Sequence, residues 1–182
     1  MGEIVKMPRR KSLWRVFYTA PRAEKKSATR LEERAIEVFL PTRVAVRQWK
    51  DRKKKVVVPL FPNYLFAHVD EGERLQVLQT PGIVRCVSFG GALAEVSPEE
   101  IENLRITQKD PGRLEPLTFP MPKKGERVII EEGPLRGLKG EVVSHRGQTH
   151  LVLLVPSIRQ AVRINVPAAW TKPLPEKHRT VF

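Results

Sequence analysis

The 182-residue chain lacks most of the groups on which catalysis, metal binding and covalent cross-linking depend. Its only cysteine, Cys86, excludes an intramolecular disulfide and a cysteine-rich metal site, and its apolar neighbours predict a buried strand thiol. The four histidines show no metal-ligand spacing, and no nucleophile has an evident base beside it. We therefore expect no catalytic residue, no cofactor and no metal, and a protein that is not an enzyme.

Long apolar runs are absent as well. No stretch of the sequence approaches the length of a transmembrane helix, and the N-terminus lacks the apolar segment of a signal peptide. These absences predict a cytoplasmic protein that makes no membrane contact.

Positive charge is what the chain has in excess. It contains 33 Lys and Arg residues against 20 Asp and Glu, a formal net charge of +13. This balance favours contact with a polyanion or an acidic surface, although a soluble protein with a basic face and no nucleic-acid ligand would have the same composition. The surplus is spread along the chain except for one dense cluster between Arg43 and Lys55.

The first 109 residues combine helical and strand-like patterns. Apolar spacing predicts an amphipathic helix over 22–38 and a short one over 71–79, and Ser97-Pro98-Glu99-Glu100 has the cap, proline and glutamate of a helix that runs to about Gln108. Strands are predicted at 14–19, 63–69 and 83–89, with a hairpin of basic tip formed by 42–49 and 56–61. The amphipathic pattern of the first helix predicts that it packs on a sheet.

The rest of the chain contains no helical pattern. Residues 110–122 contain four prolines and one glycine, which predicts an extended linker. Residues 123–175 hold only strand-like runs between glycine or proline turns, which predicts a small β-barrel. We therefore expect a basic tail over 1–11, an N-terminal domain over 12–109, the linker, a barrel domain over 123–175 and a C-terminal tail over 176–182.

The glycine-rich stretch GPLRGLKG begins at Gly133. It lacks the Gly-Lys-Ser/Thr ending of a phosphate-binding loop, and it lies between two strands rather than before a helix. We expect Gly133, Gly137 and Gly140 to shape the corner between the first two barrel strands, with Leu135 and Leu138 folded onto the core.

Four aromatic residues on or beside neighbouring strands are candidates for an exposed patch: Tyr18, Phe61, Tyr64 and Phe66. Tyr64 and Phe66 have the same parity in one strand and therefore share a face. From the residues alone, ordinary core is slightly favoured over a docking surface.

The order of motifs along the chain resembles the NusG family. WRVFY at 14–18, PLFPNYLF at 59–66 and TPGIV at 80–84 are similar to its N-terminal (NGN) domain, and KGERV at 124–128 followed by GPLRGLKG is similar to its KOW motif. The basic run at 47–54 leading into VVVPLFPNYLF looks closest to the specialised RfaH and UpxY-like antiterminators. The resemblance implies an α+β NGN domain, in which helices flank an antiparallel sheet, linked to an all-β, five-stranded SH3-like KOW barrel.

The function implied by the resemblance is transcription elongation and antitermination by a monomeric factor that acts on specific operons. Tyr18, Tyr64 and Phe66 fall on positions that dock on the clamp helices of the largest subunit of RNA polymerase, with Phe61 adjacent. The resemblance thus favours an interface over core for these aromatics. The alternatives are a housekeeping NusG that couples polymerase to Rho or the ribosome, and a KOW-containing RNA- or ribosome-binding protein.

The resemblance also implies contact with nucleic acid. Arg30, Arg34 and Thr80 match positions that touch the non-template DNA strand. A second candidate is the basic hairpin tip, which consists of Arg52, Lys53, Lys54 and Lys55. Solvated surface charge is the alternative for both groups.

Within the KOW motif, the resemblance makes Gly137 the position expected to be least tolerant of a side chain. A later loop, in which family members meet Rho or a small-subunit ribosomal protein, contains Ile158 and Arg159 here. Ile158 is the candidate apolar tip of that loop.

Overall fold

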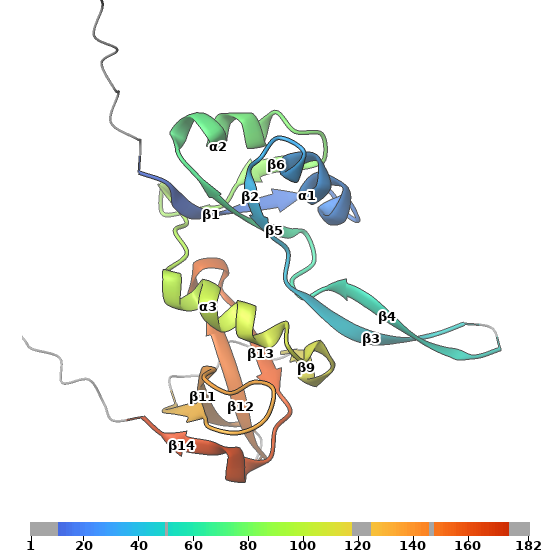
Figure 1. The fold of residues 1–182 in the computed structure, drawn as a ribbon, viewed down its shortest axis with the longest axis vertical. Helices are drawn as coiled ribbons and strands as arrows, with labels where there is room; N and C mark the ends of the chain where they lie inside the picture. The colour runs from blue at the N-terminus through green and yellow to red at the C-terminus, as the bar shows by residue number, and fades with distance from the viewer. Residues whose placement is uncertain (1–10, 50, 118–124, 146–147, 175–182) are drawn as a thin grey trace, which may run out of the picture. The chain divides into compact units, whose positions relative to one another are not determined.

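The computed structural model describes residues 11–49, 51–117, 125–145 and 148–174 (Figure 1). Nearly all of the two predicted tails, and the second half of the predicted linker, lie outside the described residues. The chain forms two compact units, one of Met1–Phe39 with Asn63–Val96 and the other of Leu40–Pro62 with Ser97–Phe182. The second unit therefore includes the predicted hairpin and the third helix together with the C-terminal strands.

The first unit contains a four-stranded antiparallel sheet in the order β2-β5-β1-β6. Its elements are β1 (Leu13–Thr19), α1 (Glu24–Glu32), β2 (Glu37–Phe39), β5 (Tyr64–Val69), α2 (Glu71–Leu78), β6 (Ile83–Cys86), β7 (Ser88–Phe89) and β8 (Ala92–Leu93). In the central pair, Val16 lies opposite Phe66 and Tyr18 opposite Tyr64. Both faces of this pair are largely buried, since Phe17, Leu65 and Phe66 are all core residues.

The predicted helix over 22–38 is wrong in its second half. The helix α1 ends at Glu32, and the backbone of Ala35 is left-handed with φ 58°. Residues Glu37–Phe39 then form β2 and pair with β5. Pairing with the sheet and burial of Ile36 outweigh the helical spacing of the apolar residues here.

The other two helices begin at reciprocal capping boxes, and their predictions are confirmed. In α3 (Pro98–Thr107), the Ser97 hydroxyl accepts a hydrogen bond from the Glu100 backbone, and the Glu100 carboxylate accepts one from the Ser97 backbone. In α2, Asp70 and Glu73 form the same arrangement. Each box satisfies two backbone donors that a helix start would otherwise leave unpaired.

The second unit contains a two-stranded ribbon and a six-stranded antiparallel sheet. The β3–β4 ribbon consists of β3 (Thr42–Gln48) and β4 (Lys53–Pro59), which confirms the predicted hairpin. Its second strand begins at Lys53 instead of Val56, because Lys53, Lys54 and Lys55 pair with β3 and do not form part of the turn. The larger sheet, called the C-terminal sheet below, has the order β14-β10-β11-β12-β13-β9. Its strands are β9 (Leu114–Pro116), β10 (Glu126–Ile130), β11 (Lys139–His145), β12 (Gln148–Val155), β13 (Gln160–Ile164) and β14 (Thr171–Pro173), with short 3-10 turns η1 (Pro111–Arg113), η2 (Pro156–Ile158) and η3 (Ala168–Trp170).

Strand β9 arises from the segment that the sequence predicts to be a linker. It pairs with β13, and the Glu115 carboxylate accepts hydrogen bonds from Arg163 and from Asn165. Burial acts to raise the pKa of Glu115, but these hydrogen bonds outweigh it and leave the pKa below its ordinary value. The described part of the segment therefore belongs to the C-terminal sheet, whose other five strands come from the predicted barrel domain.

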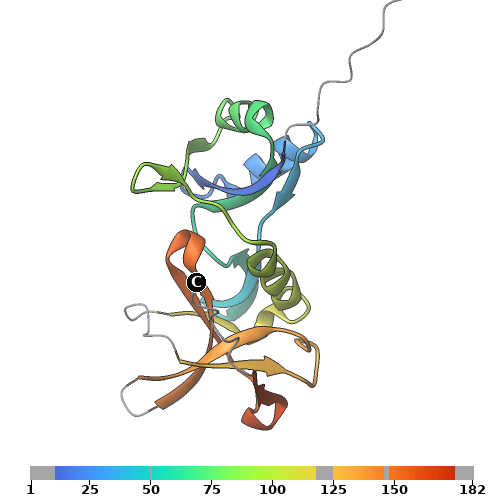
Figure 2. The ribbon, with the colours of Figure 1, turned by 90° about the vertical axis from the view of Figure 1, so that its left-hand side faces the viewer.

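The described residues contain three α-helices and two larger sheets, an α+β arrangement. None of these helices is long and apolar enough to cross a membrane. Figure 2 shows the strands of the C-terminal sheet, orange to red, beside the yellow-green helix α3 of the same unit.

Candidate functional site

Two tyrosines lie side by side on the sheet of the first unit. Tyr18 and Tyr64 are opposite each other in the register of β1 and β5, and their rings meet edge to face with centroids 5.6 Å apart. The guanidinium of Arg85 lies 5.6 Å from the centre of the Tyr18 ring. Both tyrosines are half-buried, so each ring is held by neighbours yet keeps surface for a partner. Such rigid amphipathic rings are typical anchors of protein interfaces.

The turn before β5 fixes this tyrosine pair. Asn63 has a left-handed backbone with φ 69°, its N–H donates to the Glu24 carboxylate at 2.8 Å, and its carbonyl accepts from the Thr19 N–H at 2.8 Å. The Asn63 side-chain amide also lies 3.4 Å from the Tyr18 hydroxyl. Sequence analysis missed Glu24 and Asn63. The Asn in PNY, a residue that tolerates a left-handed turn, was the available signal.

Phe66 and Phe61 do not share this exposure, which corrects their assignment to an exposed patch. Phe66 is 0% exposed, lies opposite Val16 and packs near the Phe39 ring, with centroids 6.3 Å apart. Phe61 is also buried. The parity argument placed Phe66 and Tyr64 on one face correctly, but burial varies along that face because β5 is a central strand.

The structure brings Arg30, Arg34 and Thr80 close to one loop, although Arg34 lies beyond the C-terminus of α1 and not on the helix with Arg30. Arg30 on α1 donates to the Pro81 carbonyl at 2.8 Å, and Arg34 donates to the Thr80 hydroxyl at 3.4 Å. Thr80 itself is buried and donates to the Gln76 carbonyl at 3.1 Å, so it positions Arg34 rather than facing a ligand. Each guanidinium has five donors, and both side chains are exposed, which leaves donors directed to solvent.

The same loop is closely packed at its glycine. Gly82 has φ 98°, and a Cβ added there would lie 2.4 Å from the Ser27 hydroxyl oxygen. Ser27 in turn donates to the Pro81 carbonyl at 3.2 Å. The glycine therefore allows the loop to approach α1 closely enough for Arg30 to reach Pro81.

The basic hairpin tip is exposed as predicted. The side chains of Arg52, Lys53, Lys54 and Lys55 are all open to solvent at the far end of the β3–β4 ribbon. The turn is closed by a backbone hydrogen bond from Trp49 to Arg52 of 2.9 Å. Among the described residues, these four cations form no ion pair.

The stretch GPLRGLKG forms the corner between β10 and β11, with Leu135 and Leu138 fully buried beneath it, as predicted. Gly133 and Gly137 both have left-handed backbones, with φ of 74° and 91°. A Cβ at Gly133 would lie 2.4 Å from the Trp170 ring, whereas one at Gly137 meets only ordinary contacts. Gly133 is therefore the stricter position, contrary to the expectation for Gly137.

The loop expected to meet a KOW partner is also corrected. Ile158 is only 2% exposed and forms part of the core, so it offers no apolar tip. Arg159 follows it in a left-handed conformation, φ 52°, with an exposed side chain. The 3-10 turn η2 directs the isoleucine inward and the arginine outward.

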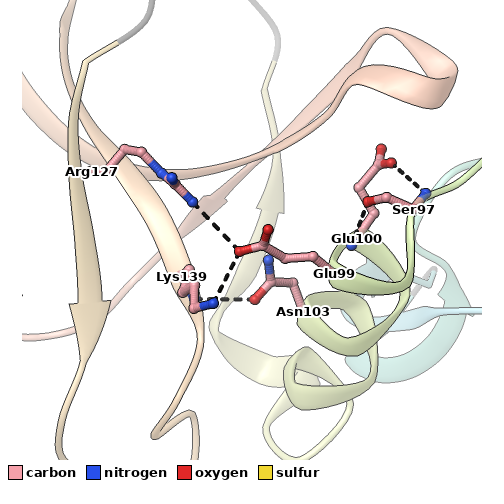
Figure 3. A network of polar contacts seen from close by, with 6 residues as sticks. All are labelled: Ser97, Glu99, Glu100, Asn103, Arg127 and Lys139. Carbon is pink, nitrogen blue, oxygen red and sulfur yellow. Dashed lines mark hydrogen bonds and ion pairs between the residues drawn. The ribbon is translucent and has the colours of Figure 1, made fainter. Parts of the chain in front are cut away.

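A polar network joins α3 to the C-terminal sheet, and sequence analysis missed it (Figure 3). The Glu99 carboxylate accepts from Lys139 Nζ at 3.1 Å and from Arg127 at 3.5 Å, and the Asn103 side-chain oxygen accepts from the Lys139 N–H at 3.1 Å. The Glu100 carboxylate accepts a hydrogen bond from the Ser157 backbone N–H at 3.2 Å. The i, i+4 spacing of Glu99 and Asn103 was the only signal in the sequence.

No feature of the described residues supports catalysis or metal binding. Burial raises the pKa of the Cys86 thiol, although Arg74 and Arg15 act to lower it, and the side chain is buried at the end of β6 as predicted. A neutral buried thiol is a poor nucleophile. Within the described ranges, no group of three His, Cys, Asp or Glu side chains could hold a metal ion.

Known proteins similar to this chain point to transcription. The transcription termination/antitermination protein NusG of Thermus thermophilus is 27% identical over 163 residues, which cover 78% of this chain and 89% of the relative. A solved structure concerning domain interaction in Thermotoga maritima NusG superposes with a TM-score of 0.53 at 19% identity, over 91% of this chain and 98% of that one. At this identity, the structural likeness supports the fold alone.

The family assignment comes from a family model. The model described as transcription termination factor nusG matches residues 12–105, which is more than half of the chain. Members of this family are transcription factors rather than enzymes. The chain therefore belongs to the NusG family of transcription termination and antitermination factors.

Proposed function

We propose that the protein is a transcription elongation and antitermination factor that docks on the clamp helices of the largest subunit of RNA polymerase. The observation that carries the proposal is the half-buried Tyr18–Tyr64 pair on the first unit's sheet. An apolar, rigid surface of this kind gains affinity by desolvation with little loss of conformational entropy. Binding favours the elongation-competent state of the polymerase by a shift in populations, without chemistry on the part of this protein.

Phe66 and Phe61 are both buried and are not part of the proposed contact. Their burial makes them unsuitable probes of docking, because truncation of a buried phenylalanine destabilises the fold itself. The proposed contact is therefore restricted to the two tyrosines and the Arg85 side chain beside them.

The test compares three forms of the full chain in a pull-down with purified RNA polymerase. The Tyr18→Ala/Tyr64→Ala variant is expected to lose at least about 1–2 kcal/mol of binding free energy, about ten- to thirtyfold in affinity. The matched control, Tyr18→Phe/Tyr64→Phe, keeps both rings and is expected to bind nearly as the parent does. Undiminished binding by a folded alanine variant would eliminate this docking site.

We also propose that Arg30 and Arg34 contact the non-template DNA strand exposed by the polymerase. Their anchoring to Pro81 and Thr80 holds both guanidinium groups near one loop, which reduces the entropy lost when they bind phosphates. Loss of binding to a bubble-shaped DNA scaffold with polymerase by Arg30→Gln/Arg34→Gln, with polymerase docking retained, would support this contact.

The C-terminal sheet is proposed to be the five-stranded SH3-like KOW barrel with β9 added at one edge. Arg159 is then the exposed residue of the loop proposed to meet Rho or a small-subunit ribosomal protein. An Arg159→Ala variant that still binds both candidate partners in pull-downs would remove this loop from the proposal.

For the target genes, we propose the specialised role on particular operons, because the basic run leading into VVVPLFPNYLF is typical of RfaH and UpxY-like members. The second candidate is the housekeeping role, which is favoured by the Thermus relative being a NusG over most of its length. Transcript profiling of a deletion strain separates the two. Changes confined to one long operon support the specialised role, and changes across the transcriptome support the housekeeping role.

A further inference from the structure

We propose that the β3–β4 ribbon binds double-stranded DNA by entering its major groove. The inference rests on the proposed function, since a factor on transcribing polymerase meets duplex DNA at the edges of the bubble. It adds the form of the nucleic acid and assigns the contacts to the two faces of the ribbon.

The shape of the ribbon suits a groove of duplex DNA. The ribbon has two antiparallel strands of seven residues each, paired from Thr42–Pro59 at its base to Gln48–Lys53 at its tip. At about 3.3 Å per residue, it is roughly 23 Å long, and its strands lie about 4.8 Å apart. A two-stranded ribbon of this width fits the major groove of B-form DNA, about 12 Å wide, whereas the major groove of A-form RNA is too narrow to read.

The ribbon forms a two-stranded sheet by itself. In the described chain, β3 and β4 pair with each other and with no other strand. Figure 1 shows β3 and β4 extending as a separate two-stranded ribbon, and β3 lies beside η1 of the same unit. Both faces near the tip are therefore open to a ligand.

The ribbon carries positive charges that no described carboxylate neutralises. Arg47 lies directly opposite Lys54 on one face, while Lys53 and Lys55 lie on the other. All four are exposed, and none forms an ion pair with a described residue. Like charges directly opposite each other destabilise a strand pair. Phosphates on either wall of a groove would remove that repulsion and release bound counterions.

Two exposed valines lie on the same face of the ribbon as Lys53 and Lys55. Val46, which lies opposite Lys55, is 61% exposed, and Val57, opposite Val44, is 53% exposed. Lysines alone are a common protection of strand edges against aggregation, but such protection does not require exposed valines beside them. Apolar side chains in the major groove contact the methyl group of thymine.

The ribbon is also held firmly at its base. The Gln108 side chain, at the C-terminus of α3, accepts from the Thr42 N–H at 2.8 Å and from its hydroxyl at 3.0 Å, and donates to its carbonyl at 3.2 Å. A ribbon fixed in this way loses less entropy on binding than a flexible hairpin does.

Single-stranded nucleic acid fits the ribbon less well. Proteins that bind single strands stack successive bases on several aromatic side chains. The ribbon and its turn contain one aromatic residue, Trp49, which is 59% exposed at the tip. A single stacking position beside several cations favours binding of a duplex over a single strand, with Trp49 at the end of the ribbon.

The experiment measures binding of the full chain, without polymerase, to a fluorescent duplex of about 20 base pairs by anisotropy at several salt concentrations. The parent protein is expected to bind with a Kd on the order of 10⁻⁶–10⁻⁴ M and a steep salt dependence. The Lys53→Gln/Lys54→Gln/Lys55→Gln variant is expected to bind at least about tenfold more weakly, with the slope of log K against log salt reduced by about 2–3. The control is Lys11→Gln/Lys25→Gln/Lys109→Gln, which removes the same charge from exposed lysines elsewhere and is expected to bind within about twofold of the parent.

A second variant tests the apolar pair without changing charge. Val46→Thr/Val57→Thr keeps β-branched side chains and is expected to weaken binding about two- to fivefold with an unchanged salt slope. Equal losses in the two lysine variants would overturn the proposal, as would equal affinity for a single strand or an RNA duplex of the same length. If the ribbon variants bind duplex as the parent does while the tyrosine variants still lose polymerase, this inference fails and the proposed function stands.

Discussion

The sheet of the first unit and the β3–β4 ribbon are built from strands of similar length, but the side chains of these strands differ in their exposure to solvent. In the sheet, β1 and β5 are central strands covered on both faces, and the aromatic Phe17 and Phe66 are fully buried. In the ribbon, no third strand is present among the described residues, and valines and lysines alike are exposed. The difference shows that strand pairing fixes a segment's conformation, whereas its neighbours in the sheet decide whether its side chains become core or contact surface.

The two regions also differ in how their charged groups are used. Arg30 and Arg34 in the first unit are anchored to backbone and hydroxyl oxygens. The cations at the ribbon tip have no such acceptor among the described residues. Anchored groups suit a fixed recognition geometry, and unanchored ones suit a polyanion whose phosphates can be met in several registers.

The largest expected effect is a loss of stability when a buried ring is removed from the sheet of the first unit. Phe66→Ala removes a fully buried ring and is expected to lower the free energy of unfolding by about 3–5 kcal/mol. Val57→Ala, on the exposed ribbon, is the comparison and is expected to cost less than about 1 kcal/mol. Urea unfolding followed by circular dichroism measures both, and similar losses in the two variants would show that the regions do not differ in burial.

The next largest effect is expected when the hydrogen bonds that hold the base of the ribbon are removed. Gln108→Ala removes three hydrogen bonds to Thr42 and is expected to cost about 1–3 kcal/mol, since the half-buried Thr42 N–H loses its acceptor. The ribbon should then be cut faster by trypsin at its lysines. Gln108→Glu keeps the acceptor oxygen and serves as the control, and an unchanged cleavage rate in the alanine variant would argue against this anchor.

A smaller effect separates stability from binding. Lys54→Glu places a carboxylate opposite Arg47 and is expected to stabilise the ribbon by about 0.2–1 kcal/mol. The same change is expected to weaken duplex DNA binding, because a phosphate contact becomes a repulsion. Thermal unfolding and anisotropy on one preparation measure the two quantities. Changes in the same direction would contradict the view that the ribbon's charges serve a ligand.

The smallest effect concerns pH. The folded-state pKa of Glu115 is lowered, so its contribution to stability is present above its unfolded pKa and is lost as the pH falls through the folded pKa. Glu115→Gln is therefore expected to make stability less sensitive to acid between about pH 5 and pH 3. Because this carboxylate is about half exposed, the change in melting temperature should be a few degrees at most. An acid sensitivity equal to that of the parent would rule out the pairing with Arg163.

Much of the fold follows from local signals in the sequence. The Ser97 cap, the hairpin at 42–61 and the inward leucines of GPLRGLKG were predicted from local sequence, and the structure has each of them. The helix predicted over 22–38 fails because Glu37–Phe39 gains more from pairing with β5 than from continuing the helix. Strand β9 was missed because its partner β13 lies about 50 residues away in the sequence. The prolines of the segment predicted a linker, and nothing local predicted the pairing.

The candidate site was predictable in position but not in exposure. Parity places Tyr64 and Phe66 on one face, yet it cannot tell that one ring is half-buried and the other fully buried. The same holds for Ile158, whose side chain turns inward in a 3-10 turn that no local motif specified. Exposure depends on elements distant in sequence, and that dependence is why Glu24, Arg85 and the Glu99 network also escaped notice.

The three tryptophans give each region its own optical signal. Trp14 stacks on His68 in the first unit at a centroid distance of 5.3 Å, Trp49 is exposed at the ribbon tip, and Trp170 lies under the Arg113 guanidinium in the second unit at 5.2 Å. Replacing any two with phenylalanine leaves a single emitter whose wavelength and quenching by iodide report on one region alone. The emission of Trp49 would respond to nucleic acid, that of Trp14 to unfolding of the sheet of the first unit, and that of Trp170 to unfolding of the C-terminal sheet. Fluorescence can therefore follow the parts of this protein separately.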